Sequence, residues 1–365
     1  MKPLRLLYLD TEAVWRGGQE QLFSLMRCLH QRGHEVHLAA PSDAPLAQRC
    51  LALGLPVHHF RQRSELSLFG LRRLLQILSQ ARFDLLHSNT PRTLITAGAA
   101  SRLQGGPLCI TSRRVIFPLR SFLSRLKYNW AQHGVIAICR TIESVLVEGG
   151  VNPNRIRVVY EGVELDWFDH LEKPPFARGL DEVLIGVVAH MSEEKGHADL
   201  LEAASLLVSR FPEARYVLIG DGALRGELEQ QCRDLRLEEF VQFTGFREDS
   251  EALMKHLDIF CLPSHSEGFS SALLAAMANR LPSVVTRVGG NHELVSEGES
   301  GILVPPADPP ELAEALWQLL ESRQLRHRMG QAARTRVEEN FTLETKIART
   351  EAVYQSLLQS RGGQG

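Results

Sequence analysis

The sequence predicts an α/β protein built from two consecutive doubly wound, Rossmann-like domains that face a cleft. Short apolar segments alternate with amphipathic segments of helical length, which is the pattern of parallel strands joined by helices. The alternation is interrupted once, at 162–175, by a charged stretch that contains prolines, and it then starts again. At 365 residues the chain is long enough for two domains, each with its own core.

The first run of the alternation gives an N-terminal domain, which we place at residues 1–170. It opens with an apolar strand at 4–9, and a helix at 18–32 ends at Gly33. Further strands are expected at 35–39, 85–87, 108–111, 135–138 and 156–159, and further helices at 68–79 and 93–103.

The second run gives a C-terminal domain, which we place at residues 171–342. Strands are expected at 183–189, 214–219, 241–244, 259–262 and 282–286, and helices at 197–211, 223–235, 251–256 and 311–323. The last segment, 343–365, contains one more helix at 343–358, which follows a charged run.

The composition is that of an ordinary soluble globular protein, with 44% hydrophobic and 23% charged residues and no apolar run near the roughly 20 residues that span a bilayer. The six cysteines are scattered and form no CxxC pair, so we expect reduced thiols in a cytoplasmic protein. The formal net charge is −2, but residues 1–170 carry eight more basic than acidic residues, and the remainder carries ten more acidic than basic ones. This asymmetry either reflects chance or directs the N-terminal half toward an anionic surface or acceptor.

The most informative motif follows the strand expected at 259–262. The turn Glu267-Gly268-Phe269-Ser270-Ser271 leads directly into a helix rich in alanine and leucine. The first N–H groups of a helix lack partners and carry partial positive charge, which suits phosphate. An acidic side chain in the same turn can bind sugar hydroxyls. The combination indicates a site for a nucleotide sugar.

Residues 264–304 resemble the donor-binding region of the retaining glycosyltransferases of family 4, which have the GT-B fold. The family pattern reads roughly PS-x-x-EGFG-x-x-x-LEAMA-x-G-x-PVV, and Glu267 matches its first glutamate. Ala275 stands where the family has a second glutamate, which typically holds the ribose hydroxyls. The resemblance covers nearly the whole chain. It implies that the helix at 343–358 crosses back to the N-terminal domain, and packing on its own domain is the alternative.

The resemblance also implies which residues bind the donor. Lys195, in the segment 190–196, matches a family lysine that reaches the diphosphate, and His190 takes the position of a family arginine. We expect two catalytic residues: Glu267 holds the transferred sugar, and Lys195 stabilises the departing diphosphate. Phe246 or the adjacent Arg247 is expected to stack on the nucleobase, and packing of the aromatic ring in a core is the alternative. The donor-binding set is Gly17, Gly18, His190, Lys195, Phe246, Glu267, Gly268, Phe269, Ser270 and Ser271.

The N-terminal domain departs from the family after the strand at 108–111. The family often has a histidine there that touches the transferred sugar, whereas this chain reads Thr-Ser-Arg-Arg at 111–114. Arg113, Arg114 and Arg120 are therefore candidates for binding an anionic acceptor or the donor phosphate. Basic residues interleave with apolar and aromatic ones over 113–130. The segment either lies on an anionic membrane surface or forms an ordinary amphipathic helix with solvated arginines.

The resemblance implies a retaining, metal-independent glycosyltransferase. It would move a sugar from a nucleotide-diphosphate sugar to a hydroxyl of a cell-surface or lipid-linked glycan, without a cofactor. The sequence contains no metal-binding motif and no nucleic-acid recognition motif. We expect a cytoplasmic protein and leave open a peripheral contact with the inner face of an anionic membrane. Two alternatives remain: a GT-B protein that has lost transfer and binds a glycan or a partner, and a sugar-nucleotide epimerase.

Overall fold

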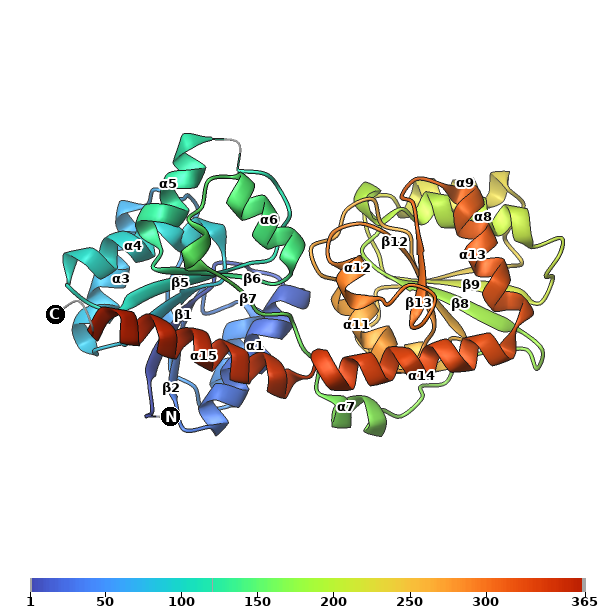
Figure 1. Ribbon diagram of the computed structural model, residues 1–365. Coiled ribbons are helices and arrows are strands. Elements are labelled where there is room, and N and C mark those ends of the chain that lie inside the picture. The colour runs from blue at the N-terminus through green and yellow to red at the C-terminus, as the bar shows by residue number, and fades with distance from the viewer. Residues whose placement is uncertain (1, 120, 363–365) are drawn as a thin grey trace. The chain divides into compact units, whose positions relative to one another are not determined.

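The computed structural model describes residues 2–119 and 121–362, which form two compact units (Figure 1). The first unit comprises the described residues up to Gly162 together with those from Leu343 onward, and the second comprises Val163–Thr342. The sequence places the boundary at residue 170, whereas in the structure it follows Gly162. The difference arises because helix α7 (Leu165–His170) packs on helix α11 (Ser271–Ala278) of the second unit.

Among the described residues, the first unit has a seven-stranded parallel sheet in the order β3-β2-β1-β4-β5-β6-β7. Its strands are β1 (Arg5–Leu9), β2 (Glu35–Ala40), β3 (Val57–His59), β4 (Leu85–Ser88), β5 (Leu108–Arg113), β6 (Gly134–Ala137) and β7 (Ile156–Val158). Its helices are α1 (Gly17–Gln31), α2 (Pro45–Ala52), α3 (Leu68–Gln80), α4 (Leu94–Leu103), α5 (Phe122–Ala131), α6 (Arg140–Glu148) and α15 (Leu343–Gly362). The sequence does not predict β3, α2 or α6, because elements this short contain too few repeats to show a period.

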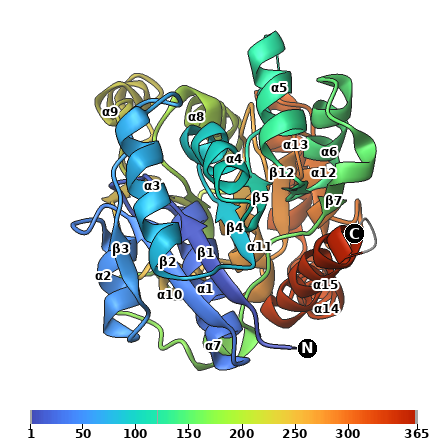
Figure 2. The same ribbon diagram turned by 90° about the vertical axis from the view of Figure 1, so that its left-hand side faces the viewer.

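The sheet of the first unit is covered on both faces, as parallel sheets usually are. Side chains alternate along β1, so that Leu6 and Tyr8 pack with α1, α2 and α15, while Leu7 and Leu9 pack with α3 and α4. Helix α15 runs along this unit beside α1 (Figures 1 and 2) and contributes Tyr354 to its core. A segment from the far end of the sequence therefore completes the hydrophobic core of the first unit.

Within its described residues the second unit has a six-stranded parallel sheet in the order β10-β9-β8-β11-β12-β13. Its strands are β8 (Val183–Val188), β9 (Ala214–Ile219), β10 (Val241–Gly245), β11 (Ile259–Leu262), β12 (Ser283–Thr286) and β13 (Gly301–Val304). Besides α7 and α11, its helices are α8 (His197–Leu207), α9 (Arg225–Asp234), α10 (Ser250–Leu253), α12 (Asn291–Leu294), α13 (Pro309–Glu321) and α14 (Arg323–Asn340). Short 3₁₀ helices are η1 (Pro91–Thr93) and η2 (Pro153–Arg155) in the first unit, and η3 (Glu193–Lys195) and η4 (Met254–His256) in the second.

Both strand orders are those of doubly wound folds, which confirms the fold class that the sequence predicts. In each unit the first strand lies in the middle of the sheet, and the fourth strand pairs with its other side. Between these two strands, the chain switches from adding strands on one side of the first strand to adding them on the other side, and the loops that follow the two strands diverge. Such folds bind ligands at the carboxyl ends of the strands at this point, which lies between β1 and β4 in the first unit and between β8 and β11 in the second.

Candidate active site

In the second unit, two loops follow the strands on either side of the change in strand order. The loop after β8 carries Lys195, and the loop after β11 carries Glu267. Lys195 Nζ donates a hydrogen bond to Glu267 Oε1 over 2.7 Å, and Ser264 Oγ donates to the same oxygen over 2.9 Å. The Glu267 side chain is 7% exposed and the Lys195 side chain is 23% exposed. The structure therefore brings the two residues that we predict to be catalytic into one ion pair.

Two glycines fix the loops that carry this pair. Gly196 has a φ of +64°, and a Cβ at this position would lie 2.0 Å from the carbonyl oxygen of Pro263. Gly289 has a φ of +52°, and a Cβ there would lie 1.5 Å from the carbonyl oxygen of Glu267. Both positions combine a left-handed backbone with a contact that excludes any side chain. The backbones beside Lys195 and Glu267 can therefore pack this closely only with glycine at both positions.

The start of α11 uses two of the predicted donor-binding side chains for its own structure. The hydroxyl of Ser270 caps the helix and accepts a hydrogen bond from the backbone N–H of Leu273 over 3.2 Å. The ring of Phe269 is buried, with its centroid 5.9 Å from that of Phe341. Ala275, which occupies the position of the family's second glutamate, is buried within the same helix. These three side chains serve capping and packing.

Three other predicted donor-binding residues of the second unit are accessible. His190 lies two residues after the end of β8, which pairs with β9 in the sheet, and the His190 side chain is exposed. Phe246 follows β10 and is 73% exposed, so the alternative of a core aromatic residue is wrong. Ser271 is the first residue of α11 and is half-buried. These residues lie at the carboxyl ends of their strands or at the start of the helix that follows.

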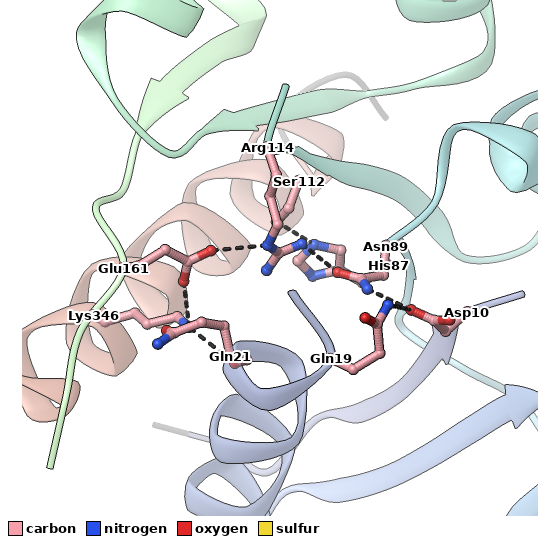
Figure 3. A network of polar contacts seen from close by, with 9 residues as sticks. All are labelled: Asp10, Gln19, Gln21, His87, Asn89, Ser112, Arg114, Glu161 and Lys346. Atoms are coloured by element: carbon pink, nitrogen blue, oxygen red, sulfur yellow. Dashed lines mark hydrogen bonds and ion pairs between the residues drawn. The ribbon is translucent and has the colours of Figure 1, made fainter. Parts of the chain in front are cut away.

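The first unit carries a second polar cluster at the equivalent edge of its own sheet (Figure 3). Asp10 follows β1 and Asn89 follows β4, and the side-chain amide of Asn89 donates a hydrogen bond to Asp10 Oδ2. Gln19 Nε2 donates to the same oxygen over 3.3 Å. Burial raises the pKa of the Asp10 carboxyl, and the bond from Asn89 opposes this rise. In both units, a polar contact thus spans the two strands where the order reverses.

A buried ion network continues from Asn89. Its side-chain oxygen accepts a hydrogen bond from Arg114 Nη1, and Arg114 Nε donates to Glu161 Oε1 over 2.9 Å. The other carboxylate oxygen, Glu161 Oε2, lies 2.6 Å from Lys346 Nζ, which also donates to Gln21 Oε1 over 2.7 Å (Figure 3). Burial alone would raise the pKa of Glu161, but the charges of Lys346 and Arg114 hold it below its usual value. The network joins the end of β5 to α15 and α1.

A second hydrogen-bonded chain runs beneath this network. His87 Nε2 lies 2.8 Å from Ser112 Oγ, and His87 Nδ1 lies 2.6 Å from the hydroxyl of Tyr354, which contacts the hydroxyl of Tyr8 at 2.8 Å. Burial lowers the pKa of His87 to about 3, so the imidazole is neutral at physiological pH. A neutral imidazole donates from one ring nitrogen and accepts at the other. A hydrogen bond with His87, on the neighbouring strand β4, therefore fixes the hydroxyl of Ser112.

The structure separates the arginines that we predict on the acceptor side. Arg114 belongs to the network described above. Arg113 is 7% exposed, and its guanidinium donates to the hydroxyl of Tyr128 over 2.6 Å and to the carbonyl oxygen of Phe117. Contrary to our expectation, Arg113 is thus an internal residue, because β5 extends to residue 113 and turns this side chain inward. Arg120 lies outside the described residues.

Gly17 and Gly18 are the first two residues of α1, beside this network. A Cβ at Gly18 would make only an ordinary contact, 3.6 Å from Arg114 Cδ, and its φ does not lie in the left-handed region. Packing within the chain therefore does not require glycine at position 18, in contrast to positions 196 and 289.

The segment 113–130 includes helix α5 and exposes several apolar side chains. Phe117 is 69% exposed and Trp130 is 41% exposed. In the part of the chain that the structure describes, none of the helices has both the length and the hydropathy of a membrane span. Membrane contact through this segment stays a prediction.

Sequence reasoning missed the polar residues that support both sites. Asp10 and Asn89 each follow a predicted strand, so their places at strand ends could have identified them. Ser264 and Gly289 lie within the region 264–304, but no pattern in the sequence indicates their roles. Within residues 2–119 and 121–362, no group of three or more histidine, cysteine, aspartate or glutamate side chains is arranged to hold a metal ion.

Comparisons with known proteins match both halves of the chain. Residues 15–167 match the family described as "Glycosyltransferase Family 4", and residues 170–336 match "Glycosyl transferases group 1". A galactosyltransferase of Escherichia coli, named for transfer from UDP-Gal to α-D-GlcNAc-diphosphoundecaprenol, is 26% identical over 77% of this chain and 77% of its own length. The capsular polysaccharide biosynthesis glycosyltransferase CapM of Staphylococcus aureus is 22% identical over 92% of this chain and 93% of its own.

Among solved structures, HepE of Anabaena in complex with UDP superimposes with a TM-score of 0.85 at 21% identity and covers 97% of this chain and 100% of its own. At this level of identity the likeness identifies the GT-B fold. The two family matches are consecutive, and each corresponds to one of the two α/β domains. The protein is therefore an enzyme of the family 4 glycosyltransferases, with a group 1 glycosyl transferase domain as its C-terminal half.

Proposed function

We propose that this enzyme is a retaining, metal-independent glycosyltransferase that uses a nucleotide-diphosphate sugar as its donor. The acceptor hydroxyl attacks the anomeric carbon from the face that the diphosphate leaves. A bond forms between the acceptor oxygen and the anomeric carbon, and the bond from that carbon to the phosphate oxygen breaks. The hydroxyl proton passes to an oxygen of the departing diphosphate, which leaves as a nucleoside diphosphate. The sugar keeps its anomeric configuration.

The ion pair between Lys195 and Glu267 carries this proposal. Glycosyl transfer of this kind places growing negative charge on the leaving diphosphate, and a lysine ammonium is a suitable partner for it. Lys195 Nζ has three donors, and one of them is bonded to Glu267. Glu267, held by Ser264, accepts hydrogen bonds from the sugar hydroxyls. His190 and the first amides of α11 add donors for the diphosphate, and Phe246 stacks on the base.

The first unit holds the acceptor in this proposal. Its polar cluster lies at the carboxyl ends of β1, β4 and β5, where doubly wound sheets bind ligands. Asn89, Ser112 and Arg114 are each partly accessible and are fixed by buried partners. Gly18 lies beside Arg114, and a Cβ there would make only an ordinary contact with Arg114 Cδ at 3.6 Å. The acceptor class that we propose is a lipid-linked or cell-surface glycan, in line with the names of the relatives from Escherichia coli and Staphylococcus aureus.

The alternative of a binding protein without transfer activity is less well supported. It rests on the departures at Ala275 and at the histidine position. The relatives that match most of this chain are named as transferases. Because HepE was crystallised with UDP, uridine-diphosphate sugars are the first donors to test.

Transfer assays on two variants test the proposal. We expect Lys195→Ala and Glu267→Gln each to lower turnover by about 10²–10³-fold, as the loss of a group that stabilises the transition state does. Arg233→Ala, at an exposed position of α9, is the control and should keep full turnover. Activity should survive EDTA, and the product should have the anomeric configuration of the donor. Unchanged turnover in both site variants would contradict the assignment, and an inverted product would contradict the mechanism.

A further inference from the structure

A cavity lies at the opposite edge of the second unit's sheet from Lys195 and Glu267. It has a volume of about 400 Å³, which is in the range of small-molecule sites. Leu257 precedes β11 and Pro282 precedes β12, so the cavity is at the amino ends of these strands. Its walls come from α7, η4, the end of α11 and the start of α14. Figure 1 shows α7 and α14 along the same side of this unit. The proposed donor site, at the carboxyl ends, does not include this cavity.

Basic side chains outnumber acidic ones around the cavity, although the half of the chain that contains them is acidic overall. The cations are Lys173, Lys255, Arg280, Arg323 and Arg326, with His327 beside them. Of the two acids of the lining, Asp258 pairs with Arg178 at 2.7 Å. Asp169 pairs with Arg334 at 2.7 Å and with Arg280, itself in the lining, at 3.3 Å. Among the described residues neither Lys173 nor Arg323 has an ion-pair partner. The cavity therefore carries an excess of positive charge that its own acids do not neutralise.

Arg326 adds a partly buried cation to this set. Its Nη1 donates to the carbonyl oxygens of Leu319 and Leu320 at the end of α13, over 2.6 and 3.0 Å, which fixes the guanidinium in place. Burial lowers the pKa of Arg326, the charge of Asp258 opposes this shift, and the charge of Arg323 adds to it. A fixed, partly desolvated guanidinium with donors to spare is well suited to an oxyanion.

Arg280 is held in a backbone conformation that favours glycine. It follows α11 with a φ of +61°, and its carbonyl oxygen would lie 2.1 Å from a Cβ at Gly330, so the backbone here is tightly packed. The chain thus has an arginine side chain at the cavity although the backbone conformation at this position favours glycine.

From this arrangement we propose that the cavity binds the phosphate or diphosphate group of a second ligand, distinct from the sugar donor. Arg280, Arg323 and Arg326 bind the oxyanion, and Lys173 and Lys255 lie at the same cavity. The apolar residues Leu257, Leu281 and Pro282 contact the rest of the ligand. The group has two sources, a free phosphate compound or the headgroup of a lipid.

The test is a titration of the protein with inorganic pyrophosphate, in which calorimetry measures the affinity. It is made in the Lys195→Ala background, so that binding at the proposed donor site is weakened. Adding Arg280→Gly should weaken pyrophosphate binding about tenfold, the size of one charge-assisted hydrogen bond. The same change should not lower the melting temperature, because glycine relieves the left-handed backbone. A loss of affinity without a loss of stability separates a binding role from a structural one.

Arg236 provides the matched control, because it is exposed at the end of α9 with a φ of +58°. Arg236→Gly removes an arginine and relieves the backbone in the same way but should leave pyrophosphate binding unchanged. On α14, Arg323→Gln should weaken binding, and Arg328→Gln, outside the cavity lining, should not.

A second arm identifies the source of the phosphate group. Flotation with phosphatidylcholine vesicles that contain phosphatidic acid is compared for the Lys195→Ala protein with and without Arg280→Gly. Pyrophosphate binding that depends on Arg280 supports a free compound, and vesicle binding that depends on Arg280 supports a headgroup. No binding of either probe, or equal weakening by Arg236→Gly, would overturn the proposal. Neither result alters the transfer assays, which test the proposed function separately.

Discussion

At the scale of single residues, the carboxylate of Glu161 is buried and depends on its neighbours for compensation of its charge. Its side chain is 3% exposed and lies between two cations that come from different parts of the first unit. A buried charge is tolerated only when it is paired and hydrogen-bonded, and here the carboxylate also neutralises Lys346, which is itself 5% exposed. Removing the carboxylate would leave an ammonium buried without a counter-charge.

We therefore expect Glu161→Gln to lower the free energy of unfolding by about 3–5 kcal/mol, the usual cost of breaking a buried ion pair from one side. Urea denaturation measures this. Glu148→Gln, at an exposed position of α6, should change it by less than about 0.5 kcal/mol. Equal stability of the two variants would contradict a buried network that depends on this carboxylate.

At the scale of secondary structure elements, the loops at the ends of β8 and β11 depend on glycine rather than on side-chain contacts. The backbone of Gly196 begins α8 and touches the backbone of Pro263. Because Lys195 directly precedes this contact, its position relative to Glu267 follows from the packing of one loop on the other.

A methyl group tests this coupling. Gly196→Ala would place a Cβ 2.0 Å from a carbonyl oxygen, so we expect the loop to shift and transfer to fall at least about tenfold, with a loss of stability of roughly 1–3 kcal/mol. Gly226→Ala is the control, because a Cβ there meets no atom within 4 Å. Since Gly226 lies inside α9, alanine should be neutral or stabilising. Activity and thermal melting of the two variants give the comparison, and full activity of Gly196→Ala would refute the coupling.

The accuracy of the sequence analysis also differs from element to element. The long periodic segments are predicted correctly because hydrophobic period is a strong signal. Helix α14 is not predicted, since few of its residues are apolar and Gly330 lies within it. Strand β5 is predicted two residues too short, and this error placed Arg113 on the surface. One strand boundary thus decides on which side of a sheet a side chain lies.

The proximity of Lys195 and Glu267 follows from the fold class. In a doubly wound sheet the first and fourth strands are neighbours, so residues after them meet. The contact between Glu161 and Lys346 could not be read from local pattern, because no periodicity relates a loop after β7 to a turn of α15. The buried pairing of charges is a property of the tertiary packing.

At the scale of the whole molecule, both units contain a buried, neutral histidine. Burial lowers the pKa of His87 in the first unit to about 3 and that of His197 in the second to about 4. In the unfolded chain each titrates near its ordinary value of about 6.5. As pH falls below this value, the unfolded state binds protons that the folded state refuses. The contribution of each neutral histidine to the free energy of unfolding is therefore complete above about pH 6.5 and is lost as pH falls toward the folded pKa values.

We expect the free energy of unfolding to fall between pH 8 and pH 5, with each histidine contributing about 2 kcal/mol. Urea denaturation at the two pH values measures the difference. His197→Gln should reduce the pH dependence by about half, whereas His292→Gln, at an exposed position, should leave it unchanged. A pH dependence that is the same in wild type and His197→Gln would show that this histidine is protonated in the folded state.

The position of α15 in the first unit affects the order in which the two units can fold during synthesis. Chains generally fold domain by domain from the N-terminus during synthesis. Here Tyr354 and Ile347 belong to the core around Leu6 and Tyr8, and Lys346 is the counter-ion of Glu161. The unit that is translated first therefore completes its core, and supplies Glu161 with the second of its two counter-ions, only when residues 343–358 emerge. The second unit is contiguous, so we expect its folding to finish before that of the first unit, in the reverse of the order of synthesis.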